Sequence, residues 1–500
     1  MHPTAAPKRD LVLAAGKAGR ARKVRAGPEA GRAGRGGPAA DNVAPAGRAA
    51  RAVAHRPSDS PSTPSRSTPT PTANSTARSS RRSPRRSTSD GAAGLAAAVL
   101  VVLVVLVVNG PSGRHGPSDA DSRRGMAAAG GRRMLASMSH TVAESLPARP
   151  AEAHALAVAR NLPGSRIVCT TTGRAQAAHA LAVERPDASV AAWFLDLHPC
   201  EAARASWNPP PPNLRATCAA DMPAGSYDLA VVPLAKDGET ELTREILQQA
   251  FVNLAIGGRL VAAIDNPHDK WLREQLAETG ETVRVRPEAG GNAASKKARP
   301  QTIAYIVEKT REPAKVRDFS CEVVFRDRDR LLTARTRPGV FAHRRIDPAA
   351  RHLLNAVDVA AETRVLDIGC GSGCVALGIA AREPSVRVHA FDSAARAVEC
   401  TRWGADHNGL ANLTVALEAE GHVPEPGTWD LALANPPYYS DFRLAELFVE
   451  SARLALAPGG TLLVVTKQPT WYLEHLPQMW TNVAREEVKG YHLIEAIRPG

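Results

Sequence analysis

A short polar segment, Asn435-Pro436-Pro437-Tyr438, directly follows the apolar run DLALA at 430–434. Each proline fixes its own φ near about −65° and restricts the residue before it, so this turn is held in one shape. The prolines carry no N–H, which leaves the Asn435 side-chain oxygen and the Pro436 carbonyl as acceptors. Such a pair could accept both hydrogens of an amino group while the Tyr438 ring stacks on a planar partner. The alternative is a β-turn that merely ends a strand.

A glycine-rich segment, GCGSG at 369–373, begins 66 residues before Asn435, between a buried-strand pattern and a helix pattern. Glycines let the backbone pass close to a ligand and to the adjoining helix. Asp367 precedes the loop, and Asp392 ends the next strand pattern, VRVHAFD, where a carboxylate can bind both hydroxyls of a ribose. No Lys-Ser/Thr follows the loop, which argues against a triphosphate cradle. The pattern favours a nucleoside-bearing cofactor.

The elements that must position these residues occur twice. From about residue 150, short β-branched runs alternate with helical stretches rich in Ala, Leu and Arg, which predicts a mainly parallel sheet covered by helices. We therefore expect an α/β protein in which one unit was duplicated at a shift of about 200 residues. The matching segments are GSRIVCTTTGR (164–174) with ETRVLDIGCGS (362–372), SYDLAVVPL (226–234) with TWDLALANP (428–436), and LAIGGRLVAAI (254–264) with LAPGGTLLVVT (456–466).

The first copy lacks both chemical segments. Its glycine loop reads CTTTGR, and Thr170 to Thr172 would crowd a cofactor. Its counterpart of the Asn-Pro-Pro-Tyr segment reads VVPLA, in which Val232 and Leu234 have no side-chain acceptor for an amine. The first copy is therefore predicted to keep the fold without either site.

The segment VLDIGCGSG with an acidic residue after the following strand resembles motif I of the Rossmann-like (class I) S-adenosylmethionine-dependent methyltransferases. The resemblance implies two seven-stranded mixed sheets and S-adenosylmethionine (SAM) as cofactor. The segment GVFAHRRIDPAARHLL (339–354) resembles the stretch that covers the cofactor in this family. By the same resemblance, the methionine and ribose portion is lined by Asp367, Gly369, Gly371 and Gly373, the ribose is bound by Asp392, and the adenine faces Glu418 or Glu420.

Asn-Pro-Pro-Tyr is the family's signature for methylation of planar amino nitrogens. A degenerate domain followed by an active one resembles the ribosomal RNA guanine-N2 methyltransferases of the small-subunit methyltransferase C type. This implies a methyl transfer to a guanine amine by Asn435, Pro436, Pro437 and Tyr438, in the cytoplasm, with ribosomal RNA (rRNA) or an assembling subunit as partner. No metal is expected, and no strong general base is needed because the sulfonium drives the transfer. The alternatives are tRNA adenine N6, a glutamine side chain of a translation factor, and a SAM-binding scaffold without turnover.

The charge of the chain lies mostly in its first part. Residues 1–140 hold 23 of the 63 Lys and Arg residues and 7 of the 50 Asp and Glu residues, so the remainder is slightly acidic. Residues 1–133 are predicted to be a disordered tail of low complexity. Its apolar run at 92–108 is at the short limit for a membrane span, so it indicates either an anchor or an over-long gene start, with Met126, Met134 or Met138 as the first residue.

A basic stretch separates the two copies. Residues 291–345 hold 14 Lys and Arg residues against 6 acidic ones, which indicates either a solvated connector or a phosphate-contacting surface. The triplet His343-Arg344-Arg345 has the same two interpretations. Seven cysteines without a CxxC pair indicate a reducing compartment and no zinc site. The predicted domains are a tail at 1–133, a degenerate methyltransferase domain at 145–310, a strand-rich connector at 311–345 and a catalytic domain at 346–500.

Overall fold

The structure, a computed structural model, describes residues 147–288, 300–437 and 442–500. The predicted tail at 1–133, with its apolar run at 92–108, lies outside the described residues. Among the residues that are described, no helix has the length and apolar character needed to cross a bilayer.

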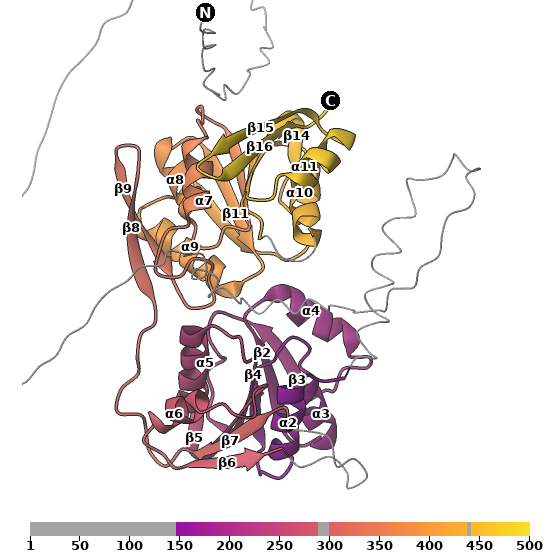
Figure 1. Ribbon diagram of the computed structural model, residues 1–500, viewed down its shortest axis with the longest axis vertical. Helices are drawn as coiled ribbons and strands as arrows, with labels where there is room; N and C mark the ends of the chain where they lie inside the picture. The colour runs from indigo at the N-terminus through magenta and orange to yellow at the C-terminus, as the bar shows by residue number, and fades with distance from the viewer. Residues whose placement is uncertain (1–146, 289–299, 438–441) are drawn as a thin grey trace, which may run out of the picture. The chain divides into compact units, whose positions relative to one another are not determined.

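The first copy is built from short strands that alternate with helices (Figure 1). Its inner strands, unlike the two edge strands, are rich in Val, Ala and Ile and are buried over most of their length, as expected for a sheet covered on both faces. The elements are α2 (Pro150–Ala159), β1 (Arg166–Cys169), α3 (Gln176–Glu184), β2 (Ser189–Phe194), α4 (Leu197–Ser206), β3 (Leu214–Cys218), β4 (Tyr227–Leu234), α5 (Thr240–Val252), β5 (Leu254–Ile264), α6 (Trp271–Ala277), β6 (Val283–Pro287) and β7 (Ile303–Glu308).

The second copy repeats this order. An antiparallel hairpin of β8 (Cys321–Asp327) and β9 (Arg330–Thr336) precedes it. The elements are α7 (Pro348–Asn355), β10 (Arg364–Ile368), α8 (Cys374–Arg382), β11 (Arg387–Asp392), α9 (Ala395–His407), β12 (Leu413–Leu417), β13 (Trp429–Ala434), α10 (Arg443–Ala455), β14 (Leu456–Thr466), α11 (Thr470–His475), the 3-10 turn η1 (Leu476–Gln478), β15 (Thr481–Val488) and β16 (Tyr491–Ile497).

The two sheets have the same topology. Their strand orders are β3-β2-β1-β4-β5-β7-β6 and β12-β11-β10-β13-β14-β16-β15, seven strands each. In both, the penultimate strand in that order runs antiparallel to its neighbours and the central strands are parallel. The prediction of two tandem Rossmann-like units with seven-stranded mixed sheets is therefore confirmed.

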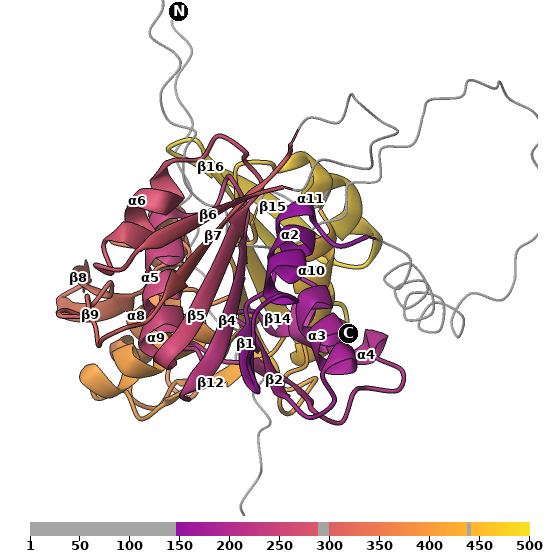
Figure 2. The same cartoon turned by 90° about the horizontal axis from the view of Figure 1, so that it is seen from below.

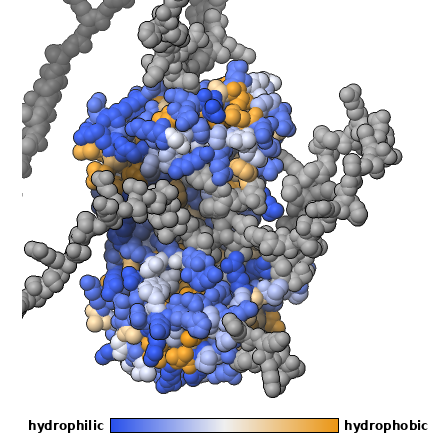
Figure 3. Space-filling model, viewed as in Figure 1, coloured by the Kyte–Doolittle hydropathy of each residue, from blue (hydrophilic) through white to orange (hydrophobic). Residues whose placement is uncertain are grey.

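Each sheet has a hydrophobic core on both of its faces. In the second copy, α7 and α8 pack on one face, and α10 and α11 pack on the other. In the first copy, α2, α3 and α4 cover one face and α5 and α6 the opposite one, as Figure 2 shows. The face seen in Figure 3 is mostly hydrophilic. On the hairpin, Val324 and Leu331 are large apolar side chains that remain exposed.

The basic connector uses several of its cations within the protein. Arg337 is buried, and it pairs with Asp221, Glu245 and Glu399 at 2.5–2.7 Å. In the triplet at 343–345, His343 and Arg344 both contact the Glu241 carboxylate of α5. A shared carboxylate was not among the two interpretations of this triplet, because spacing along the chain does not reveal that α5 lies beside it.

Candidate functional site

The candidate site is built on the ends of four adjacent parallel strands of the second sheet. Ile368 of β10 pairs with Ala434 of β13 on one side and with Phe391 of β11 on the other, and Asp392 pairs with Leu417 of β12. The next residue on each strand is therefore at the same edge, where parallel α/β sheets place their ligands. With neighbouring strands about 4.8 Å apart, this edge presents, in order, Glu418, Asp392, Gly369 and Asn435.

The glycine loop connects β10 to α8 in a left-handed conformation that suits glycine. Gly369, Gly371 and Gly373 have φ values of 74°, 56° and 80°. A Cβ at Gly369 would lie 2.7 Å from the Phe448 ring, and one at Gly373 would lie 2.8 Å from the Thr401 hydroxyl. At Gly371 a Cβ would meet nothing within 4 Å. Two of the three glycines are thus required by packing, and the third borders open space beside the loop.

Two carboxylates accept hydrogen bonds from backbone N–H groups in and around this loop. Asp367, which is 3% exposed, accepts a hydrogen bond from the Ala376 N–H in the first turn of α8 at 3.0 Å. Asp392 accepts from the Gly371 N–H with one oxygen and from the Ala394 N–H with the other, both at 2.9 Å. Each Asp392 oxygen keeps a second lone pair, which is what two vicinal hydroxyls of a ribose require.

Burial disfavours the charged form of both groups. It raises the pKa of Asp392 to about 6, and it raises the pKa of Asp367, which also senses the Asp392 charge, to about 7. Two neighbouring acids with raised pKa values at a strand edge are typical of a binding or catalytic site.

Glu418 lies at the outer end of the row. Its N–H donates to the Asp392 carbonyl at 3.0 Å, and its own carboxylate accepts from the Glu420 N–H at 2.6 Å. Of the two residues predicted to face an adenine, Glu418 is the more buried, because Glu420 is exposed. The role of Glu418 stays a prediction.

Asn435 occupies the inner end of the row, one residue beyond the strand pair Ile368–Ala434. Asn435 and Pro437 are half-buried and Pro436 is buried. The Asn435 Nδ2 donates to Asp347 Oδ2 at 2.8 Å. Tyr438, the fourth predicted catalytic residue, lies outside the described residues.

Asp347 is a candidate residue that the sequence analysis did not single out. It is the N-cap of α7 and also accepts from the Ala350 N–H at 3.1 Å. The Asp-Pro pair before an apolar helix pattern is a recognisable N-cap signal. That signal predicts the cap, but it does not predict the contact with Asn435, which is 88 residues away in the chain.

The first copy presents different groups at the same positions. Cys169 stands where the second copy has Asp367, and Phe194 stands where it has Asp392. Ala175, at the third glycine position, takes a strained left-handed φ of 53°. Pro233 replaces Asn435 and has no side-chain acceptor. That this copy lost both sites stays a prediction, which these replacements support.

A direct contact joins the first copy to the segment that follows Asp392 in the second. Leu197 donates its N–H to the Ser393 carbonyl at 2.8 Å, and Ala395 donates to the Leu195 carbonyl at 2.9 Å. The Ser393 hydroxyl donates to Asp196 Oδ2 at 2.9 Å. The residue after Asp392 is therefore held by the first copy through both backbone and side chain.

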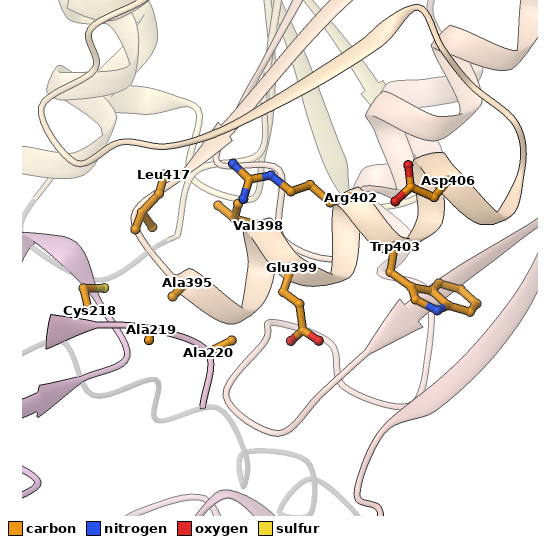
Figure 4. A pocket seen from close by; sticks show the side chains of 10 residues that line it. All are labelled: Cys218, Ala219, Ala220, Ala395, Val398, Glu399, Arg402, Trp403, Asp406 and Leu417. Atoms are coloured by element: carbon orange, nitrogen blue, oxygen red, sulfur yellow. The ribbon is translucent and has the colours of Figure 1, made fainter. Parts of the chain in front are cut away.

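A cavity of about 440 Å³ lies along one face of α9, between that helix and residues Cys218 to Ala220 (Figure 4). Glu399, Arg402 and Trp403 line it from α9, and Leu417 borders it. None of the predicted site residues lines this cavity, although Leu417 directly precedes Glu418.

Comparison with known proteins agrees with this geometry. The family model of the methyltransferase small domain matches residues 331–495. The second copy is similar to a methyltransferase small domain over this range. The ribosomal RNA small subunit methyltransferase C of Klebsiella pneumoniae is 33% identical over 138 residues, which are 27% of this chain and 40% of that protein. The protein of the same name from Pseudomonas entomophila is 31% identical over 166 residues, or 32% of this chain and 49% of that protein.

These alignments span less than half the length of the curated relatives. A likeness over more of the chain comes from the solved T. thermophilus 16S rRNA N2 G1207 methyltransferase in complex with AdoMet and guanosine. Its TM-score is 0.55 at 22% identity, and the match covers 70% of this chain and 92% of that one. The two copies together thus share the fold of this solved protein, and the resemblance noted in the sequence is confirmed.

Proposed function

We propose that this protein transfers a methyl group from S-adenosylmethionine to the exocyclic N2 amine of a guanine in ribosomal RNA. The observation that carries the proposal is the register of the second sheet. It places Asn435 on the strand next to the glycine loop, at the same level as Gly369. The methyltransferase small domain and the name shared by the relatives support the same reaction.

The residues of the strand edge fit the proposed cofactor. The Asp392 carboxylate would accept from the ribose hydroxyls, and the open side of Gly371 would give the ligand its approach to the loop. Glu418 would lie at the adenine end, two strands away from Gly369. Bound there, S-adenosylmethionine would supply an electrophilic methyl group on a sulfonium.

The acceptor groups would overcome the low nucleophilicity of the amine. The lone pair of an exocyclic amine is delocalised into its ring, so the nitrogen is flat and unreactive. The Asn435 Oδ1 and the Pro436 carbonyl would accept its two hydrogens and favour the pyramidal nitrogen of the transition state. Because these groups are fixed before the reaction, they act by orientation and electrostatics. Tyr438 is proposed to stack on the base. The proton can leave after the transfer.

Ribosomal RNA in the cytoplasm is the proposed substrate and place of action. The tandem fold supports it, since the match to the T. thermophilus 16S rRNA methyltransferase covers 70% of this chain and 92% of that one. Two of the exposed arginines of the hairpin, Arg326 and Arg330, are proposed to contact its phosphates.

The full chain, incubated with radiolabelled S-adenosylmethionine, tests the proposal. Three substrates are offered: small ribosomal subunits assembled on unmodified transcript, bulk tRNA and a release factor. We expect label in the subunit RNA, recovered as N2-methylguanosine after nuclease digestion and mass spectrometry. Label in tRNA or in the release factor would move the reaction to adenine or glutamine. Label in none of them, together with measurable cofactor binding, would favour a scaffold.

A further inference from the structure

We infer that Asp347 is a positioning residue for methyl transfer, acting through Asn435. The inference rests on the proposed function and extends it to a group that lies one contact behind the acceptor. Asp347 Oδ2 accepts from Asn435 Nδ2 at 2.8 Å and from the Ala350 N–H at 3.1 Å. One carboxylate oxygen thus ties the start of α7 to the acceptor segment.

The contact determines which end of the amide faces the substrate. An ionised carboxylate only accepts hydrogen bonds, so it can pair with the amide nitrogen of Asn435 and repels the amide oxygen. Rotation of the amide by 180° would bring two oxygens together and is disfavoured. Oδ1 is therefore held on the opposite side of the planar amide, as the acceptor that the amine needs.

The charge adds an electrostatic effect to this orientation. A carboxylate on the N–H side polarises the amide and strengthens Oδ1 as an acceptor. During methyl transfer the amine nitrogen gains positive charge, and a fixed negative group on the far side of the amide favours that change. These effects act on the transition state more than on the bound substrate, so they predict a loss in kcat rather than in affinity.

The position of Asp347 is fixed by a tightly packed helix. It caps α7, whose Leu353 and Leu354 are buried in the core of the second copy. Leu354 packs so closely on α8 that a Cβ at Gly378 would lie 2.6 Å from it. The Asp347 carboxylate is thus anchored at the end of a tightly packed helix, which limits how far Asn435 can rotate.

The first copy shows that helix capping alone does not account for Asp347. Its corresponding helix, α2, begins at Pro150 after Arg149, whose side chain makes no capping hydrogen bond. The Ala151 N–H is bonded instead by Asp265, at 2.6 Å. In that copy Pro233 stands where Asn435 would be, so both members of the pair have been replaced. Where the amide acceptor is absent, the helix begins without this aspartate.

The substitution Asp347→Ser separates the two roles. Serine is as good an N-cap as aspartate, but its hydroxyl is too short to hold Asn435 as well. We expect kcat to fall about 10- to 100-fold on unmodified small subunits, with the cofactor Kd within about twofold of the original. The matched control is Asp269→Ser, which replaces a carboxylate that bonds the Leu272 N–H of α6 in the first copy, and it should leave kcat unchanged.

Two further variants give the contact its specific signature. In an Asn435→Ala background, Asp347→Ser should cause no additional loss, because its route of action is already gone. Asp347→Asn should restore part of the activity, since its amide oxygen can accept both hydrogen bonds without the charge. A wild-type kcat in Asp347→Ser, or an additive loss in the double variant, would overturn the inference.

A measurement without substrate tests the contact between Asp347 and Asn435 independently of the methyl transfer reaction. In protein labelled with ¹⁵N-asparagine, the Asn435 side-chain amide signal is assigned by its loss in Asn435→Ala. We expect Asp347→Ser to move this signal and to speed its hydrogen exchange. An unchanged signal would refute the contact even if guanine methylation is observed. A moved signal, in a protein that methylates no guanine, would support the contact while the proposed reaction fails.

Discussion

The two copies share one fold and differ at the carboxyl edge of their sheets. Both have the strand order 3-2-1-4-5-7-6 within their own numbering, and both bury a hydrophobic core on each face. The second copy has Asp367, Asp392 and Asn435 at or next to the ends of its central strands, and the first has Cys169, Phe194 and Pro233 at the same positions. The sheet and its helices therefore do not depend on the polar groups at this edge.

In the first copy, a carboxylate from a different helix bonds the start of the helix that follows the loop. In the second copy Asp367 bonds an N–H in the first turn of α8. In the first copy Glu152, from α2, bonds the Ala177 N–H of α3 at 3.0 Å and the Thr172 hydroxyl at 3.0 Å. Glu152 is only 1% exposed, and burial raises its pKa. The Glu152 carboxylate thus bonds both the loop and the first turn of α3, in a copy that is predicted to bind no cofactor.

The largest difference between the two copies is expected from the substitution Asn435→Ala. We expect turnover to fall about 100- to 1000-fold, because one of two fixed acceptors at the reacting nitrogen is removed. Cofactor affinity should change little, since Asn435 follows the neighbouring strand β13 and is not part of the glycine loop. Methyl transfer to unmodified subunits and calorimetric titration with cofactor measure the two effects. The matched change Pro233→Ala in the first copy should leave turnover intact, and unaltered turnover in Asn435→Ala itself would falsify the role of this residue.

Much of this comparison could be predicted from the sequence. The three repeated segments contain strands whose β-branched and apolar runs are long enough to be recognised, and in α/β sheets a segment after such a run must lie at the carboxyl edge. Asp392 and Asn435 were predicted to belong to one site for this reason. The register adds that they stand on the two strands that flank β10.

Contacts between distant side chains were not predictable in this way. The Asp347–Asn435 pair, the Glu152 contacts and the clustering of Arg337 and Arg396 around Glu245 each join segments with unrelated sequence patterns. A local pattern shows what a residue does to its own helix or turn. It does not show which helix start lies beside which strand end, because side-chain packing decides that.

The substitution Asp392→Asn tests the proposed ribose contact, with a smaller expected effect. The amide keeps one acceptor but must present N–H groups where Gly371 or Ala394 now donates. We expect the cofactor Kd to rise about 10- to 100-fold, with kcat at saturating cofactor changed much less. Calorimetry measures the affinity. An unchanged Kd would mean that the two copies do not differ functionally at Phe194 and Asp392.

The pH dependence of cofactor binding should follow the ionisation of Asp392, which the first copy lacks. Burial raises the pKa of Asp392 to about 6. The ionised form would be the better acceptor for the ribose hydroxyls of the proposed cofactor. Affinity should therefore rise with pH, with a Kd that falls up to about tenfold per unit below about pH 6 and levels off above about pH 7. The free energy of unfolding has the opposite sign. A raised pKa in the folded state means that ionisation costs stability, which decreases as pH rises from about 4 to about 7. Asp392→Asn should remove this group's part of both trends.

A stability measurement tests the Glu152 carboxylate of the first copy. Glu152→Ala leaves the Ala177 N–H buried without its acceptor, which typically costs about 1 to 3 kcal/mol in the free energy of unfolding. Urea unfolding at pH 7 measures the loss, and Glu184→Ala, at an exposed ion pair with Arg160, is the control with an effect below about 1 kcal/mol. Equal losses in the two variants would contradict the structural role given to Glu152.

The smallest effect is expected in the hairpin, which belongs to neither sheet. Arg337 and Arg344 of the basic connector are bound to carboxylates, so only part of its charge can contact RNA. Arg326 and Arg330 are exposed, and replacing both by alanine should raise the KM for small subunits severalfold and lower the salt slope of binding by about 1 to 2. Filter binding at several salt concentrations measures the slope. Because neither arginine touches the strand edge, kcat should stay constant. A fall in kcat without a change in slope would mean that the hairpin supports the catalytic copy instead of binding phosphate.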